Sequence, residues 1–151
     1  MLICFAIILF IFTFNNKSIK PSITTVKDII YLNDLTLNDP TTKVIERMGE
    51  KYEAAQEDGS GADYVMIYDE NIRIYIVNNH IDKIIVKDVN LRHFENFFNS
   101  FEGIKFTNDK DRYMYSKPSE QLIKATTNTP NEKLYLYFMY PDDQFYNSYN
   151  F

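Results

Sequence analysis

The stretch YVMIYDENIRIYIVNNHIDKIIV, residues 64–86, contains three short runs in which apolar side chains recur at every second position. A period of two is typical of β-strands that bury one face. In the middle run the repeating residues of one face are isoleucines: Ile72, Ile74 and Ile76. Polar residues that tolerate tight turns separate the runs, at 69–71 (DEN) and 78–80 (NNH). The pattern predicts an antiparallel meander with an isoleucine-rich buried face.

The segment NDPTTKVIERMGEKY, residues 38–52, carries the signals of a short helix. Asn38 or Asp39 suits the N-cap, Pro40 suits the first helical position, and Gly49 suits the residue that ends a helix. The apolar side chains between these signals fall on one side of a helix: Val44, Ile45 and Met48. We therefore predict a helix of about three turns or fewer here.

A second helix is predicted within residues 90–106, where large apolar residues recur at intervals of three and four. They are Leu91, Phe94, Phe97, Phe98 and Phe101, and Gly103 follows them. The strand candidates that come next are 111–116, 121–127 and 132–140. Residues 53–63, rich in Gly, Ser and acids, are predicted to form a flexible loop, and residues 141–151 a loosely packed end.

Both predicted helices are followed by strands, which suggests an internal duplication. Three pairs of positions match when the halves are aligned: Leu37 with Leu91, Gly49 with Gly103, and Tyr52 with Phe106. Chance matches between apolar residues are the alternative explanation. The predicted fold class is α+β, with short helices packed on one face of an antiparallel meander sheet. We assign residues 28–151 to a single domain with repeat units 35–87 and 89–140.

The first residues of the chain suggest a targeting segment. Residues 1–14, MLICFAIILFIFTF, are almost wholly apolar and uncharged, and residues 15–27 form a polar linker. The apolar run fits a secretory signal better than a helix across the bilayer core, which needs about 20 apolar residues. Two interpretations stay open, a cleaved signal peptide and a short membrane anchor; a buried terminal element of a cytosolic protein is the alternative to both. We predict an exported protein, secreted or anchored in the membrane and facing outside.

Residues 35–86 combine a short helix, the sequence MGEKYE, a Gly-rich loop and the three alternating runs. This order resembles the repeat unit of small bacterial envelope proteins of the SmpA/OmlA and β-lactamase-inhibitor-protein-like group. In that group the helix ends in a glycine, usually with a proline two residues on, where this chain has Lys51. The resemblance covers about a third of the chain. It implies a non-catalytic exported domain that holds another protein with its sheet face or its loops.

Charge and cysteine content narrow the range of functions. The chain has a formal charge of −5, and its acids and bases are interleaved, so it has no basic field for nucleic acid. The single cysteine, Cys4, lies in the apolar leader. We therefore predict no nucleic-acid partner, no internal disulfide and no thiolate catalysis in the folded part.

The residues that could carry out catalysis or bind a metal are few and scattered. The two histidines, His80 and His93, lie in a predicted turn and at the start of a predicted helix. Acidic pairs such as Glu57–Asp58 and Asp142–Asp143 lie in predicted loops, where acids commonly form turns. We predict no catalytic residue, no metal site and no cofactor. A small hydrolase, the least supported alternative, requires His80 or His93 within hydrogen-bonding reach of a serine or a carboxylate.

Aromatic residues on predicted strands are the candidate binding site. Tyr135 and Tyr137 alternate with leucines in KLYLYFMY, and Arg73 and Tyr75 lie opposite the isoleucine face. Tyrosines on an outward sheet face serve protein recognition or sugar stacking, although they also stabilise a sheet as cross-strand neighbours. We predict that these four residues bind a protein partner in the cell envelope. A cell-wall or carbohydrate-binding module that uses the C-terminal tyrosines is the alternative, and the leader, 1–14, is the candidate membrane contact.

Overall fold

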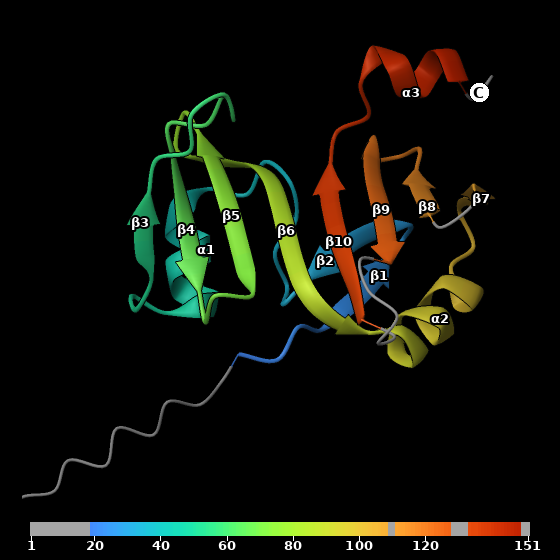
Figure 1. Cartoon of the computed structure of the whole chain (residues 1–151), viewed down its shortest axis with the longest axis horizontal. Coiled ribbons are helices and arrows are strands. Elements are labelled where there is room, and N and C mark those ends of the chain that lie inside the picture. The colour runs from blue at the N-terminus through green and yellow to red at the C-terminus, as the bar shows by residue number, and fades with distance from the viewer. Residues whose placement is uncertain (1–18, 109–110, 128–132, 149–151) are drawn as a thin grey trace, which may run out of the picture.

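The computed structural model describes residues 19–108, 111–127 and 133–148 (Figure 1). Strands account for 50% of the structure and helices for 18%. The predicted antiparallel sheet with short helices is therefore confirmed, but the sheet outweighs the helices more than the α+β class implies. The predicted leader, 1–14, lies outside the described residues.

The main sheet contains eight strands in the described part of the chain, in the order β3-β4-β5-β6-β10-β9-β8-β7. Their bounds are β3 Glu53–Ala55, β4 Tyr64–Tyr68, β5 Ile72–Val77, β6 His80–Asn90, β7 Ile104–Asn108, β8 Asp111–Ser116, β9 Gln121–Thr127 and β10 Lys133–Met139. All neighbouring strands are antiparallel. The sheet thus consists of two meanders, β3–β6 and β7–β10, joined where the last strand of each, β6 and β10, pair side by side.

A helix precedes each meander. Helix α1 spans Thr41–Met48 and α2 spans Leu91–Ser100. The order of one helix and four strands therefore occurs twice, although the duplication of sequence stays a prediction. We call α1 with β3–β6 the first unit and α2 with β7–β10 the second unit.

The predicted turns of the first meander are confirmed. Asp69 and Glu70 have φ of 47° and 61°, and Asn78 and Asn79 have φ of 49° and 63°. Two consecutive residues with positive φ match the right-handed twist of the strands that they join. These two-residue turns fix the register, so that Ile72, Ile74 and Ile76 all reach the core.

One face of the sheet packs on the main hydrophobic core. A two-stranded hairpin, β1 (Ile23–Val26) and β2 (Ile29–Leu32), lies behind the middle of the sheet in Figure 1, and α1 lies behind β4 and β5. The fully buried residues of this cluster come from every layer and include Leu32, Val44, Ile74, Ile84 and Leu136. Burial of each such side chain contributes about 1.5–3 kcal/mol, so this face provides most of the apolar stabilisation.

The two helices begin and end differently. Pro40, predicted at the first helical position, is instead the N-cap of α1 and offers no side-chain cap, while Gly49 ends the helix at φ 91° as predicted. In α2 the side chain of Asn90 accepts hydrogen bonds from two backbone N–H groups, and Phe101 is the C-cap. Gly103 therefore does not end α2. It allows a close approach, because a Cβ there would lie 2.5 Å from the Phe101 ring.

Several segments differ from the sequence prediction. Ile23–Val26, placed in the predicted linker, form β1, and Glu53–Ala55, placed in the predicted loop, form the short edge strand β3. Ile104–Asn108, merged with the second predicted helix, form the opposite edge strand β7. The expected loose end contains a third helix, α3, at Asp143–Ser148. These elements are short or lie at sheet edges, where hydrophobic periodicity gives a weak signal.

The two predicted helices, α1 and α2, pack on the main-core face, whereas the helix that was not predicted, α3, packs on the opposite face. Phe145 of α3 is 6% exposed and packs with Tyr115 and Leu122 in a second, smaller cluster. Tyr115 and Leu122 point away from the main core, because their strand neighbours Met114 and Ile123 belong to it. Helix α3 therefore covers part of the outward face of the second unit.

Candidate binding face

The outward face of β5, β6 and β10 brings the four predicted site residues together. By strand alternation, this face carries Arg73 and Tyr75 from β5, Lys83 and Ile85 from β6, and Tyr135 and Tyr137 from β10, which we call the outward strip. Arg73 pairs with Ile85, and Ile85 pairs with Tyr137, so they form one row across the sheet. Neighbouring strands lie about 4.8 Å apart, which places the backbones of Arg73 and Tyr137 about 10 Å apart.

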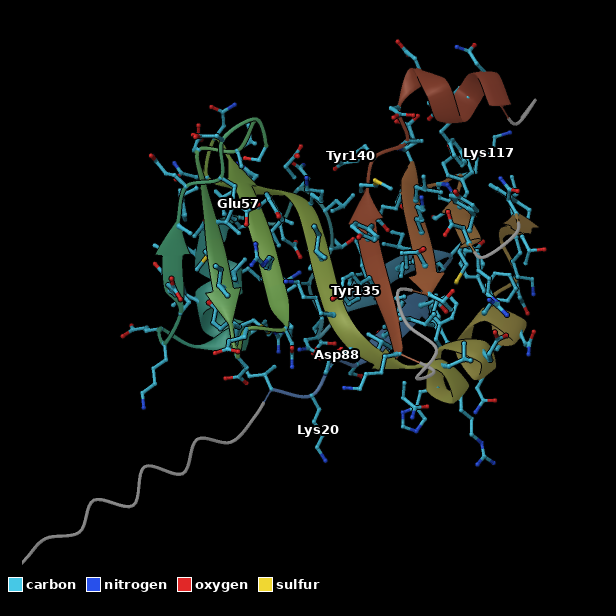
Figure 2. All side chains as sticks on the ribbon, viewed as in Figure 1. Lys20, Glu57, Asp88, Lys117, Tyr135 and Tyr140 are labelled. Carbon is cyan, nitrogen blue, oxygen red and sulfur yellow. The ribbon has the colours of Figure 1, made fainter. Side chains whose placement is uncertain are left out.

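Tyr135 and Tyr137 are the half-buried aromatic residues of this strip. They alternate with Leu134, Leu136 and Phe138, all of which are buried in the main core. Figure 2 labels Tyr135 on β10, near the middle of the sheet. The predicted alternation in KLYLYFMY is thus confirmed, and both tyrosines present part of their surface outward.

Arg73 and Tyr75 are held by a residue that the sequence analysis did not select. Glu57, in the connection between β3 and β4, forms an ion pair with Arg73, and the Tyr75 hydroxyl donates a hydrogen bond to its other carboxylate oxygen at 2.7 Å. Tyr75 is only 4% exposed, and Val65 beside it on the same face is fully buried. The segment 56–63 therefore folds over this part of the outward face, as the position of Glu57 in Figure 2 also indicates.

The burial of Tyr75 has an electrostatic consequence. Burial first, and then the hydrogen bond to Glu57, raise the pKa of the Tyr75 phenol. The ammonium group of Lys83 lies 4.1 Å from the centre of the Tyr75 ring, a distance typical of a cation–π contact. Tyr75 thus stays protonated and able to donate a hydrogen bond at neutral pH.

Several outward positions of the central strands carry cations. They are Arg73, Lys83, Lys87 and Lys124, while the two acids of β6 are exposed where its register with β5 and with β10 shifts. Lys124 pairs with Asp111 of β8 at 2.9 Å, and that hydrogen bond raises the pKa of Lys124. Among the described residues, Lys83 and Lys87 have no ion pair. Two lysines of this face are therefore available for an acidic group, although the chain as a whole carries −5.

A pocket of about 450 Å³ lies at the C-terminal end of β6, where residues 88–90 form part of its lining. Its apolar wall includes Ile23, Phe94 and Phe97, and its polar residues include Asp88 and His93. Asp88 is 3.7 Å from the ammonium group of Lys133. The pocket thus brings one imidazole and one carboxylate into a shared lining, which includes no serine from the described residues.

The remaining candidates for chemistry have structural contacts. The imidazole of His80 lies 2.8 Å from the carbonyl oxygen of Asn78 in the same turn. Asp142 accepts a hydrogen bond at 2.8 Å from the backbone N–H of Phe145 at the start of α3. Within residues 19–108, 111–127 and 133–148, no three His, Cys, Asp or Glu residues come together as metal ligands.

None of the helices in the described ranges is long and apolar enough to cross a membrane. No protein-family model, curated protein or solved structure matches this chain. The resemblance to the SmpA/OmlA and β-lactamase-inhibitor-protein-like group therefore stays a prediction.

Proposed function

We propose that the chain is a non-catalytic protein of the bacterial cell envelope, exported or tethered to the membrane, that binds a protein partner with its outward strip. The observation that carries this proposal is the composition of the strip. Half-buried tyrosines share one face of the sheet with two lysines that have no ion pair among the described residues, and the other face is filled by the core. Tyrosine and arginine are enriched where proteins bind one another, because they combine large contact area with specific hydrogen bonds.

The shape of the site supports a protein partner over a small molecule. The strip lies on the pleated surface of three paired strands, and the pocket of about 450 Å³ is lined by a different set of residues. Small-molecule sites are typically concave and enclose most of the ligand. An extended face with aromatic and charged groups fits a partner that contributes its own surface.

Site-specific photocrosslinking in intact cells tests the proposal. A photoreactive phenylalanine analogue replaces Tyr137 on the strip or, as a control, Val26, which is 57% exposed on the hairpin of the opposite layer. We expect a discrete crosslinked envelope protein from position 137 and none from position 26. Crosslinks from position 26 alone, or no crosslink from position 137, would contradict the proposal.

The alternative, a cell-wall or carbohydrate-binding module, has its own supporting observation. Tyr140 and Tyr146 are each 42% exposed, and exposed aromatic rings stack on sugars. Sedimentation of the chain with purified peptidoglycan distinguishes the two functions. Loss of sedimentation in a Tyr140→Ala/Tyr146→Ala variant, with no crosslink from position 137, would favour the carbohydrate module.

A further inference from the structure

We propose that Arg73 and Tyr75 form a binding site for a carboxylate of the partner, and that Glu57 occupies this site in the free chain. This inference rests on the proposed function, since it names the chemistry by which the outward strip recognises its partner. The partner is accordingly a protein that presents an aspartate, a glutamate or a C-terminal carboxylate.

The geometry of the site is already that of a carboxylate receptor. One oxygen of Glu57 pairs with the Nη1 group of Arg73, and the other accepts the Tyr75 hydroxyl at 2.7 Å. A guanidinium and a phenol that donate to the two oxygens of one carboxylate define both its position and its plane. Any carboxylate that reached the same place would find the same donors.

The guanidinium of Arg73 has one N–H donor that makes no hydrogen bond to the described residues. The Nε group of Arg73 is buried and has no hydrogen-bond partner among the described residues, although 29% of the side chain is exposed. Arginine binds carboxylates best through two parallel N–H groups, and the present pair does not satisfy Nε. A partner carboxylate that engages Nε as well as an Nη group would form the stronger, two-pronged pair.

Glu57 belongs to the segment 56–63, whose middle makes few hydrogen bonds to the sheet among the described residues. Gly59 and Gly61 have φ of 75° and 74°, and each has open space around its Cα. The hydrogen bonds from Ser60 to Glu57 and from Ala62 to Ser60 stay within the segment, while its end is fixed by Asp63, which forms hydrogen bonds with Ile76 and Asn78. Among the described residues, the Glu57 side chain makes the polar contacts that join the middle of the segment to the sheet, so its exchange for another carboxylate leaves the strands intact.

Charge favours an acidic partner at this place. Lys83 and Lys87 flank the site on β6 without ion pairs among the described residues. Positive groups that stay unpaired after Glu57 is seated attract a second negative surface and steer its approach. The tethered Glu57 competes at an effective concentration of the order of millimolar, so a weak single carboxylate does not displace it, whereas an acidic protein surface with several contacts does.

Nuclear magnetic resonance of the full chain in detergent micelles tests the site with a defined probe. The probe is N-acetylglutamate N-methylamide, with the neutral glutamine analogue as its control. The signals followed are Arg73 Nε–H and the Tyr75 ring. The variants are Glu57→Gln, which removes the charge of the tethered competitor, and Glu53→Gln, which makes the same chemical change on the exposed edge strand β3.

We expect the acidic probe to bind Glu57→Gln about tenfold more tightly than it binds the wild-type chain or Glu53→Gln, because the tethered competitor is gone. The glutamine analogue should shift neither signal, and a Glu57→Gln/Arg73→Lys variant, which keeps the charge, should lose the gain. Equal binding to all variants, or binding that does not shift Arg73 Nε–H, would overturn the carboxylate site.

A partner found by crosslinking separates this inference from the proposed function. If position 137 captures an envelope protein whose affinity is unchanged by Glu57→Gln, the binding function stands and the carboxylate site falls. If the probe binds as expected but position 137 captures nothing, the site stands and the protein-binding function falls.

Discussion

The two units of the sheet share their order of elements but cover their outward faces with different chemistry. In the first unit a loop reaches over the face and buries Val65, and its hydrogen-bonded contacts run from Glu57 to Arg73 and Tyr75. In the second unit a helix lies on the face, and its contact is apolar, from Phe145 to Tyr115. The strip with Tyr137 lies between these two covers.

This difference indicates which cover can move. An apolar cover keeps its contacts only while water is excluded, so its removal exposes Tyr115 and Leu122 and costs the energy of their burial. A polar cover can be exchanged for another polar group with little net change, because water or a ligand replaces the lost hydrogen bonds. We therefore expect α3 to contribute more to stability than the segment 56–63, whose exchange the proposed carboxylate site requires.

The largest effect is expected from removal of the apolar cover. Phe145→Ala should lower the free energy of unfolding by about 3 kcal/mol, because the ring is 6% exposed and its loss leaves a cavity against Tyr115. A urea titration of the full chain measures this change. Tyr140→Ala, at a position that is 42% exposed, is the control and should cost less than about 1 kcal/mol. Equal effects of both would show that α3 does not stabilise the sheet.

A larger side chain at Gly49 or at Gly103, the two glycines matched in the aligned halves, should destabilise the chain, but for different reasons. Gly49→Ala and Gly103→Ala should each cost about 1–3 kcal/mol, the first through its φ of 91° and the second through the Phe101 ring 2.5 Å from the new Cβ. A double-mutant cycle with Phe101→Leu separates the causes. The smaller side chain should relieve the penalty at position 103 and leave the penalty at position 49 unchanged. Equal relief at both would contradict the assignment.

High pH should destabilise both units through a buried tyrosine in each. Burial is the main cause that raises the pKa of Tyr68 and of Tyr115 to about 12 in the folded chain. Because the folded pKa exceeds the ordinary value of 10, this stability is complete below pH 10 and is lost as the pH rises through about 12. Each tyrosine contributes a slope of up to about 1.4 kcal/mol per pH unit in that window.

The contribution of one unit can be isolated by substitution. Tyr68→Phe removes the titrating hydroxyl, which donates to the carbonyl of Gly49 at 2.9 Å. Between pH 10 and 12, the slope of the unfolding free energy against pH should become shallower by the contribution of one tyrosine, up to about 1.4 kcal/mol per pH unit. An unchanged slope, measured by urea titration at several pH values, would exclude Tyr68 as a source.

The side-chain cap of α2, which α1 lacks, should contribute about 1 kcal/mol to the free energy of unfolding. Asn90→Ala removes the acceptor for the N–H groups of Arg92 and His93, at 3.0 and 3.3 Å, and should destabilise the chain by that amount. Asn96→Ala, at an exposed position within the same helix, is the matched control and should be neutral or slightly stabilising. If both changes have the same effect, the cap does not stabilise α2.

The smallest effect on stability is expected from the polar cover. Glu57→Gln should change the free energy of unfolding by less than about 1 kcal/mol, because the side chains of Glu57 and Arg73 are 31% and 29% exposed and solvent screens their attraction. Hydrogen exchange of segment 56–63 should nevertheless increase, since its middle loses its contact with the sheet. A loss as large as that of Phe145→Ala would contradict the difference between the covers.

Much of the sheet could be predicted from the sequence, because its strands bury one face completely. The alternation of Ile72 to Ile76 gave β5, and the polar pairs at 69–70 and 78–79 gave the turns. Strand β3 was missed because its three residues, Glu53–Ala55, carry no buried apolar side chain. Strand β7 was missed because it is a short edge strand whose only two apolar side chains, Ile104 and Phe106, are too few for a clear alternation.

The site could be predicted only in part. Periodicity placed Arg73, Tyr75 and Tyr137 on the outward face, and the register confirms that face. No local signal indicates that Glu57 would cover Tyr75. The position of a Gly-rich loop over the sheet depends on how distant strands pair, which local sequence does not specify. The pairing of β6 with β10, which unites the two halves of the strip, is likewise a long-range contact that local patterns do not specify.

That central pairing also sets the order in which the chain can finish folding. Strand β6, His80–Asn90, has 11 residues, and its partner β10 is the last strand among the described residues. During synthesis from the N-terminus, β6 therefore has a long unpaired backbone edge until β10 has been made. An unpaired strand edge can pair with other chains and cause aggregation. A frameshift or an early stop after Asn90 should accordingly yield insoluble material and not a working half-protein.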